Sequence, residues 1–381
     1  MIKKHYLLSP GPTPIPEGVL AAATHPMIHH RTPEFSRIFM DVVTGIKTIF
    51  QTENDVFILA SSGSGAMEAA VVNTLSPGDS AIVINGGKFG NRWGRICRAY
   101  GVSVREIILE WGEPYAKEQL SEELEINLDV NAVFSTLAET STGTEYDIRG
   151  YGEIVAQSEA LLVVDGISGI GAISCPMDEW NLDVLLSASQ KSFMVPPGLA
   201  YISFSKKAWS LVERSTSPKY YFDVKEAKTS MRRGTSPWTP AISLILQQQE
   251  ALKIIARFGL ENFISHHRIL GEATRAGVQS IGLELLSKRP ANILTAVKTP
   301  NGIDGEILVK TMQEKYKTYI AGAQDPHKGK FFRIAHLGYM GGFDVITALS
   351  ALEMTLEDLG YSFQKGASLC AAKEILKENW K

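Results

Sequence analysis

Short apolar runs alternate with helix-like segments through the first half of this 381-residue chain. The predicted strands lie at Val56–Ala60, Ala81–Ile84, Val102–Leu109, Ala132–Thr136 and Leu161–Val164. Most of the intervals between them carry helical segments, around Arg92–Tyr100, Glu118–Glu125 and Gly150–Ser158. Strands that are apolar on both faces and alternate with helices form a mostly parallel sheet with helices on both sides. We therefore predict an α/β fold whose ligands bind at the carboxyl ends of the strands.

The two ends of the chain have a different texture. The proline-rich stretch Ser9–Pro16 predicts an extended arm, because proline lacks a backbone donor and restricts its neighbour. Apolar residues at helical spacing predict a helix over Glu34–Phe50. Past Pro240 the pattern predicts long helices and short strands, at Ala241–Phe258, Leu260–Gly277, Ile281–Leu285, Ile293–Val297, Asp304–Lys315, Phe331–Ala335, Asp344–Leu359 and Gly366–Asn379. We predict an arm over residues 1–15, a large domain over 16–270 and a smaller α+β domain over 271–381.

Composition narrows the functional classes. Apolar residues make up 44% and charged residues 21% of the chain, and the net charge is -3. With no concentrated basic run, the sequence argues against a nucleic-acid surface. The cysteines Cys97, Cys175 and Cys370 lie far apart without metal-ligand spacing, which predicts a reducing compartment and no metal site. No signal peptide or membrane span is visible, so we expect a cytoplasmic protein without membrane partners.

A single lysine, Lys191, lies between two apolar runs within Leu182–Phe204. Burial of an ammonium group costs several kcal/mol, so desolvation favours the neutral amine that can attack a carbonyl. Lys191 is therefore a candidate Schiff-base lysine. The alternative by position alone is a solvated lysine at a strand end.

Two further features fall at predicted strand ends. The turn Ser61–Gly65 opens a helix, where unpaired backbone donors and the helix dipole favour an anion such as phosphate. Asp165 ends the strand LLVVD, and a buried carboxylate there would suit the protonated nitrogen of a pyridine ring. A tight connection and a cap aspartate are the structural alternatives. Together with Lys191, these features supply an anchor for the phosphate, a counter-charge for the ring nitrogen and an amine for the aldehyde, which are the groups that would bind pyridoxal phosphate.

The chain resembles the class V aminotransferases among the fold type I pyridoxal-phosphate enzymes. Within that family it is most similar to the alanine–glyoxylate, serine–glyoxylate and serine–pyruvate aminotransferases. The resemblance runs almost end to end, through LLSPGPTPIP, HHRTPEF, SGSGAMEAAVVNTLSPGD, ETSTG, VVDGISGIG, SASQKSFMVPPGLAYISFS, TSPWTPAISL and KGKFFRIAHLG. It implies a large domain with a mostly parallel seven-stranded sheet, a smaller α+β domain, and pyridoxal 5'-phosphate as cofactor.

The resemblance also implies roles for residues around the cofactor ring. Lys191 would bind the cofactor aldehyde and then move the proton between substrate and cofactor as general acid and base. Asp165 would keep the ring nitrogen protonated. Thr140 matches the hydroxyl beside the ring oxygen, and Phe89 matches the aromatic residue that stacks on the ring, with a core phenylalanine as the alternative.

Further residues match the family's anion-binding positions. Ser64, Gly65 and Gln190 match phosphate contacts. The family builds each site across a homodimer interface, and the partner's phosphate contacts would come from the segment that contains Thr235, Trp238 and Thr239, where the common tyrosine is absent. The substrate-binding candidates are Arg333 for the carboxylate, Arg31 near the entrance and Gly11 through its backbone. The departures Leu137, Ala138 and Ala66 replace histidines of some members and bear on substrate preference.

The implied reaction is transfer of an amino group from alanine or serine to glyoxylate or pyruvate by ping-pong kinetics. A donor such as aspartate or 2-aminoethylphosphonate stays open, with Arg31, Arg232 and Arg233 as possible cationic partners for a phosphonate. A cysteine desulfurase-like lyase is the rival within the fold, but Gln190 stands where those enzymes carry histidine. A different class of function, an electron-transfer or scaffold subunit, is also an alternative, because relatives of this family have been labelled hydrogenase subunits.

Overall fold

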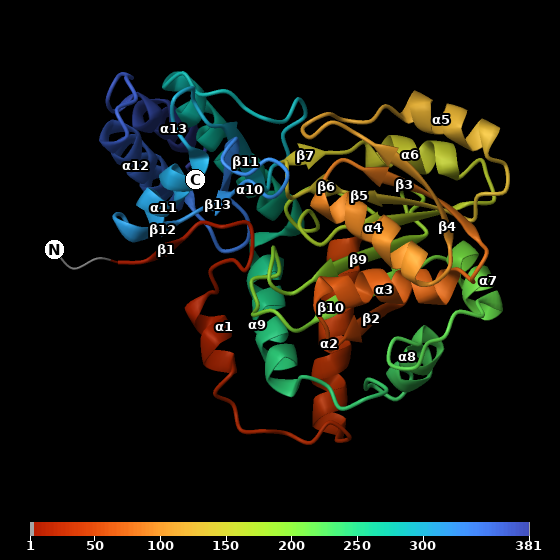
Figure 1. The fold of residues 1–381 in the computed structure, drawn as a ribbon. Helices are drawn as coiled ribbons and strands as arrows, with labels where there is room; N and C mark the ends of the chain where they lie inside the picture. Colours follow the sequence, from red (N-terminus) through yellow and green to blue (C-terminus); the bar gives the residue numbers. More distant parts are fainter. Residues whose placement is uncertain (1–3, 381) are drawn as a thin grey trace.

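The computed structural model describes residues 4–380. Residues 1–3 of the predicted arm and residue 381 of the predicted small domain lie outside the described part. A seven-stranded sheet forms the centre of the protein (Figure 1). Its spatial order is β2 (Val56–Leu59), β10 (Ala200–Phe204), β9 (Val184–Ala188), β8 (Leu161–Asp165), β5 (Ala132–Thr136), β3 (Ser80–Asn85) and β4 (Ser103–Ile108).

Strand direction confirms the predicted architecture. Strand β10 runs antiparallel to both of its neighbours, β2 and β9, whereas every other pair in the sheet is parallel. The mostly parallel seven-stranded sheet implied by the sequence is therefore confirmed. The carboxyl ends of β5, β8 and β9 meet at one edge, which is the position where such sheets bind ligands.

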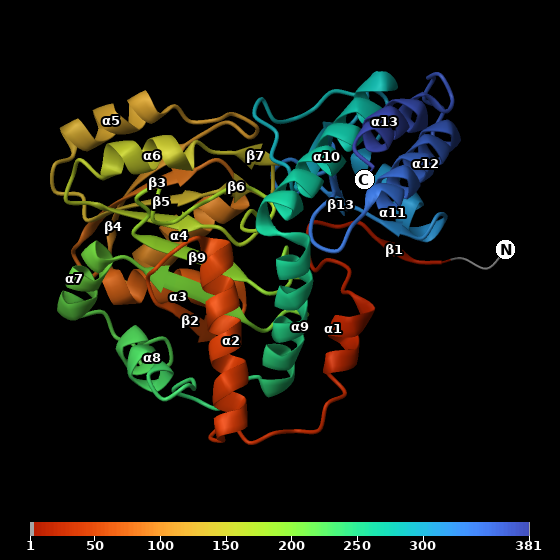
Figure 2. The same ribbon diagram turned by 180° about the vertical axis from the view of Figure 1, so that it is seen from behind.

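Helices cover both faces of the sheet, as the two opposite views show (Figures 1 and 2). Along β3 the side chains alternate between two cores: Ile82 and Ile84 face one, and Ala81 and Val83 face the other. The first core is closed by α2 (Pro33–Phe50), α5 (Lys117–Ile126), α6 (Ile148–Val155) and α9 (Ile242–Phe258). The second is closed by α3 (Gly63–Thr74), α4 (Lys88–Ala99), α7 (Lys206–Arg214) and α8 (Val224–Met231). This two-sided burial explains why the strands are apolar throughout.

A smaller unit follows along the chain. Its antiparallel sheet has the order β11 (Leu294–Lys298), β14 (Phe331–Ala335) and β13 (Ala321–Gly322). The helices packed around it are α10 (Leu260–Ser280), α11 (Gly305–Glu314), α12 (Gly342–Asp358) and α13 (Ala367–Glu378). The domain boundary at residue 270 stays a prediction, and that residue lies inside the continuous helix α10.

One predicted strand is wrong. Residues Ile281–Leu285 form no strand, and only Leu285 makes an isolated bridge, to Val297. The chain turns at Gly282, whose φ of +81° lies in the left-handed region. A turn there breaks the extended backbone that a ladder needs, so the apolar residues pack without strand pairing.

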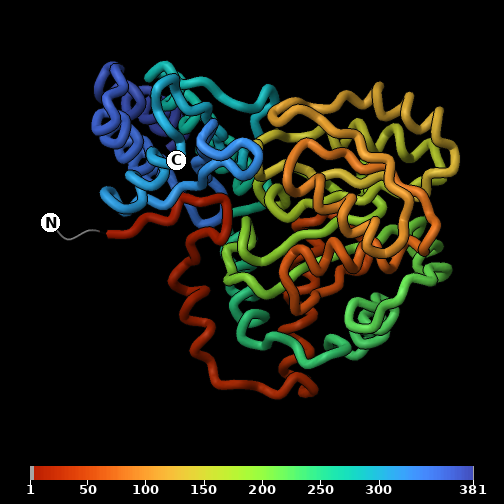
Figure 3. Tube along the Cα trace, in the orientation of Figure 1, coloured from red at the N-terminus to blue at the C-terminus, as the bar shows by residue number. Residues whose placement is uncertain are grey.

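The N-terminal arm joins the two units. After β1 (Tyr6–Leu7), which pairs in parallel with β12 (Thr318–Tyr319), the arm crosses toward the sheet and enters α1 (Glu17–Ala22). The Cα trace shows this N-terminal segment beside the C-terminal unit (Figure 3). Between β1 and α1, the backbone N–H of Thr13 donates to Gln190 O at 3.2 Å. The arm thus connects β12 with the loop that carries the candidate lysine.

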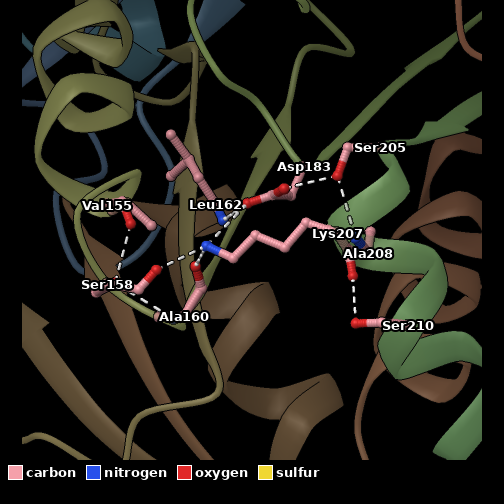
Figure 4. A network of polar contacts seen from close by, with 9 residues as sticks. All are labelled: Val155, Ser158, Ala160, Leu162, Asp183, Ser205, Lys207, Ala208 and Ser210. Carbon is pink, nitrogen blue, oxygen red and sulfur yellow. Dashed lines mark hydrogen bonds and ion pairs between the residues drawn. The ribbon is translucent and has the colours of Figure 1, made fainter.

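The opposite edge of the sheet holds a purely structural network (Figure 4). Lys207 Nζ donates to the backbone oxygens of Ser158 and Ala160, at 2.9 and 2.6 Å. Asp183, just before β9, accepts a hydrogen bond from Ser205 Oγ at 2.6 Å. These contacts tie helix α7 to the amino ends of β8 and β9, away from the edge where the candidate site lies.

Candidate active site

A cavity of about 210 Å³ opens at the carboxyl edge of the sheet. It brings together residues from the arm, from the start of α3 and from the ends of β5, β8 and β9. Seven of the sequence-predicted site residues line it: Gly11, Ser64, Phe89, Thr140, Asp165, Gln190 and Lys191. The remaining lining residues are Pro12, Ser62, Gly63, Arg92, Ala138, Ile167, Ser168 and Pro197.

The loop between β9 and β10 positions Lys191. Ser189 closes this loop, because its backbone N–H donates to Leu199 O at 3.0 Å and its Oγ donates to Pro196 O at 2.7 Å. Lys191 lies inside the closed loop with 9% of its surface exposed, and its Nζ donates to Pro10 O of the arm. Within residues 4–380 the buried lysine amine therefore has a single carbonyl as its hydrogen-bond partner, which is not the environment of a solvated strand-end lysine.

Gly11 lies directly against the lysine amine. Its φ is +127°, in the region that favours glycine, and a Cβ built there would lie 2.5 Å from Lys191 Nζ. Any larger residue would therefore displace the amine. The expectation that Gly11 faces the pocket through its backbone agrees with this close approach.

Two ionisable groups in the cavity have shifted pKa values. Burial lowers the pKa of Lys191 to about 8, with Arg333 and Arg92 lowering it further and Asp165 raising it. Burial raises the pKa of Asp165 to about 6, against the hydrogen bond that its Oδ1 accepts from Ile167 N at 2.8 Å. A lysine amine that becomes neutral near physiological pH can act as nucleophile and base.

The start of α3 forms an anion-binding corner of the cavity. Ser62 is the N-cap, and Gly63, Ser64 and Gly65 form the first turn. The Gly65 N–H donates to Ser62 O at 2.9 Å, whereas within residues 4–380 the N–H groups of Gly63 and Ser64 have no hydrogen-bond partner. A Cβ on Gly65 would lie 2.6 Å from Ser61 Oγ, so the tight turn requires glycine. The helix dipole and these donors favour a phosphate at this end of the cavity.

Sequence analysis did not identify Glu139 as a functional residue. This fully buried carboxylate accepts hydrogen bonds from the backbone N–H groups of Phe89 and Gly90, at 3.1 and 2.8 Å, and from Ser141 N at 3.1 Å. It therefore holds the first turn of α4, which carries Phe89. The acidic residue of the ETSTG motif was visible in sequence, but its target lies fifty positions away in the chain.

A second missed residue supports Thr140. Thr140 Oγ1 donates to Ser168 Oγ at 2.6 Å, and both side chains are buried. Ser168 follows Asp165 in the GISGIG loop, so one loop presents the acid and orients the hydroxyl. Arg92, the third missed residue, also lines the cavity and donates from Nη1 to Ser64 Oγ at 3.1 Å.

Arg333 lies just behind the cavity wall. Its Nη1 donates to Thr140 O at 2.9 Å and its Nη2 to Gly322 O at 2.7 Å, while its buried Nε has no hydrogen-bond partner among residues 4–380. Only 6% of its surface is exposed, and burial lowers its pKa to about 10. Its role as the substrate carboxylate clamp stays a prediction.

Besides Gly65 and Arg333, four predicted residues do not line this cavity: Arg31, Thr235, Trp238 and Thr239. Thr235 Oγ1 donates to His30 O at 3.2 Å, and Trp238 Nε1 donates to Tyr221 O at 3.0 Å. Their predicted contribution to the site of a neighbouring subunit depends on how two chains associate, and it stays a prediction.

Comparison with known proteins now identifies the family. The family model described as Aminotransferase class-V matches residues 5–321. The chain belongs to the class V aminotransferases. The expected enzyme class, a pyridoxal-phosphate-dependent transaminase, is confirmed, and the family depends on that cofactor in general.

Curated relatives match this aminotransferase over nearly its whole length. The L-aspartate–glyoxylate aminotransferase of Paracoccus denitrificans is 35% identical over 99% of this chain and 98% of its own. The serine–glyoxylate aminotransferase of Hyphomicrobium methylovorum is 34% identical over 98% of this chain and 95% of its own. A Synechococcus protein named soluble hydrogenase, small subunit, is 41% identical over 99% of both chains.

A solved structure confirms the fold. The ureidoglycine–glyoxylate aminotransferase of Bacillus subtilis superposes with a TM-score of 0.94 at 26% identity, covering 99% of each chain. The predicted fold type I architecture is therefore correct. Among residues 4–380, no helix is both long enough and apolar enough to cross a membrane.

Proposed function

We propose that this aminotransferase transfers an amino group from alanine or serine to glyoxylate or pyruvate, using pyridoxal 5'-phosphate in a ping-pong reaction. The observation that carries the proposal is the placement of Lys191, with a lowered pKa, in one cavity with Asp165 and the amino end of α3. Relatives named for serine–glyoxylate and aspartate–glyoxylate transfer support the acceptor class.

The donor set of the cavity fits the cofactor. Ser64, the first turn of α3 and Gln190 would hold its phosphate. In the described part of the chain the buried Gln190 Oε1 has no hydrogen-bond partner. Asp165 would hold the ring nitrogen, and Thr140 the ring oxygen. Phe89 would cover one face of the ring.

When bound, pyridoxal phosphate supplies an aldehyde for the amine and an electron sink for the substrate Cα. Lys191 Nζ would act as the base that takes the proton from the substrate Cα and as the acid that returns it. Asp165 would hold the protonated ring nitrogen, because a negative carboxylate in a buried site would then have a positive partner. The arm residue Gly11 leaves room for the amine to swing between these positions.

The walls of the cavity favour a small uncharged donor side chain. The charged lining residues are Arg92, Asp165 and Lys191, and the arm side is lined by Gly11 and Pro12. Aspartate would need a second cation near the substrate. Because the Paracoccus relative is named for aspartate–glyoxylate transfer, aspartate is the second candidate donor.

We further propose a homodimer whose partner contributes Thr235, Trp238 and Thr239 to the phosphate site and Arg31 to the entrance. In support, this segment carries an aromatic cluster in which Trp238 stacks on Tyr220 at 4.7 Å, and Tyr220 is 75% exposed. An exposed aromatic cluster of this kind suits a subunit interface. A cytoplasmic location is proposed from the three unpaired cysteines.

A half-reaction screen tests the substrate assignment. The purified enzyme is loaded with pyridoxal phosphate and mixed separately with alanine, serine, aspartate, glutamate and 2-aminoethylphosphonate, and the visible absorbance of the cofactor is followed. Alanine or serine should convert it at the highest rate. Failure of both, with conversion by another donor, would contradict the proposed specificity.

Sulfur transfer and electron transfer are less well supported. A desulfurase needs a cysteine that reaches the cofactor, whereas Cys370 is exposed on α13 and does not line the cavity. The name of the Synechococcus relative suggests a redox subunit. Conversion of the cofactor by an amino acid alone would favour transamination over both.

A further inference from the structure

Arg92 lines the cavity at the same corner as the first turn of α3. It lies on the second turn of α4, directly after the segment that Glu139 holds through Phe89 and Gly90. Its Nη1 donates to Ser64 Oγ at 3.1 Å, and its guanidinium lies over the Phe89 ring, 4.8 Å from the centroid. Both contacts bring the cation to the corner where the α3 donors converge.

Unlike Arg98 of the same helix, Arg92 has no acidic partner in the described part of the chain. Among residues 4–380, no carboxylate oxygen lies within 4.0 Å of its guanidinium, and its only hydrogen-bond acceptor is Ser64. Arg98, in the last turn of α4, is exposed and forms an ion pair with Glu106. A half-buried guanidinium without an acidic partner, most of whose N–H groups lack an acceptor, costs folding free energy unless a ligand accepts hydrogen bonds from it.

The surrounding charges favour an anion at this position. The positive charge of Arg92 lowers the pKa of both Lys191 and Asp165, so it acts across the cavity. In the absence of an anion, two cations therefore oppose each other in a partly desolvated space. A phosphate dianion beside Arg92 would reduce this repulsion and would accept from the guanidinium as well as from the α3 amides.

We infer that Arg92 binds the phosphate group of the cofactor, as a charged partner to Ser64 and the α3 turn. The inference rests on the proposed function, because it assigns the cavity to pyridoxal phosphate. The competing interpretation is that Arg92 only packs on Phe89, which would cover the cofactor ring. The two differ in whether the phosphate itself is recognised, so a cofactor with and without phosphate separates them.

The test compares Arg92→Gln and Arg92→Lys with the wild-type chain and with the control Arg98→Gln. The full-length chains are freed of cofactor and titrated with pyridoxal phosphate and with pyridoxal, and binding is followed by quenching of intrinsic fluorescence. Circular dichroism and thermal melting of the cofactor-free chains check that each variant is folded. Inorganic phosphate is used as a competitor of pyridoxal phosphate.

Arg92→Gln should weaken binding of pyridoxal phosphate about tenfold to hundredfold, as loss of a charge-assisted hydrogen bond does. Pyridoxal binding should change by less than about twofold, and Arg92→Lys should recover part of the affinity because it keeps the charge. Competition by inorganic phosphate should weaken in Arg92→Gln. Arg98→Gln should match the wild type in all titrations.

Two outcomes would overturn the inference. One is an unchanged affinity of folded Arg92→Gln for pyridoxal phosphate. The other is an equal loss of affinity for pyridoxal phosphate and pyridoxal, since this would assign Arg92 a packing role. If the wild-type chain itself binds no pyridoxal phosphate, the proposed function fails instead, and that result is distinct from both.

Discussion

Replacement of Asp165 by asparagine should stabilise the cofactor-free protein while damaging the enzyme. The Asp165 carboxylate is buried, and among residues 4–380 its one hydrogen bond comes from Ile167 N. Asparagine keeps an acceptor for that N–H but carries no charge. The variant therefore removes the cost of a buried charge and also removes the partner of the cofactor ring nitrogen.

The magnitude follows from the raised pKa of Asp165. Its pKa is about 6 in the folded protein against 3.8 as the ordinary value. Between these values the folded chain holds more protons than the unfolded chain, so stability falls as pH rises, and the full penalty is present above about pH 6. At about 1.36 kcal/mol per pH unit, the penalty that Asp165→Asn would relieve is about 3 kcal/mol at pH 8 and roughly half of that at pH 5.

The assay is urea and thermal unfolding of the cofactor-free wild type and Asp165→Asn at pH 5 and pH 8. For a chain of this length, about 3 kcal/mol corresponds to a melting-temperature rise of about 4 °C. A matched control is Asp178→Asn, because the exposed Asp178 accepts hydrogen bonds from Thr52 Oγ1, Glu53 N and Asn54 Nδ2. That replacement should destabilise the chain by about 1 kcal/mol.

Addition of pyridoxal phosphate should reverse the order of stability. The wild type should gain more from the cofactor than Asp165→Asn does, because only the carboxylate pairs with a protonated ring nitrogen. An Asp165→Asn variant that is no more stable than wild type at pH 8, or whose advantage does not shrink at pH 5, would refute the argument from the buried charge. An equal gain from the cofactor in both proteins would refute the ring-nitrogen role.

Two further predictions concern the lysine and the arm. The rate at which the cofactor-free chain attaches pyridoxal phosphate should rise with pH through a midpoint near pH 8 and level off above it, because the pKa of Lys191 is lowered to about 8 and only the neutral amine attacks. Stopped-flow absorbance checks this, and a midpoint near the ordinary lysine value would contradict it. Lys191→Ala should lose at least about a hundredfold in transamination rate. Gly11→Ala should lower kcat at least about tenfold and cost about 1–3 kcal/mol of stability, because its Cβ would lie 2.5 Å from Lys191 Nζ at a φ of +127°. Gly78→Ala is the control, because Gly78 has a φ of +93° but no described atom lies within 4 Å of a Cβ built there. Gly78→Ala should therefore lose stability through its backbone conformation while kcat stays normal. Equal kcat values in the two variants would refute the clash with Lys191.

The sequence alone determined the sheet, its covering helices and seven of the residues that line the candidate site. Continuous apolar strands specify a sheet buried on both faces, and in a parallel sheet their carboxyl ends share one edge. Asp165 at the end of β8, Lys191 after β9 and the turn before α3 therefore had to converge, and the structure brings them into one cavity. These are local patterns combined with one rule of topology.

Only the tertiary structure revealed the residues that act on this site from other parts of the chain. Glu139 holds the backbone of Phe89, and Arg92 reaches Ser64 from a neighbouring helix. Gly11 was predicted from the sequence, but its close approach to the Lys191 amine was not. No periodicity encodes such contacts, because they depend on how separate elements pack. The same reason explains the failed strand at residues 281–285, where apolar residues suggested pairing but a turn at residue 282 and packing in the small unit decided the backbone.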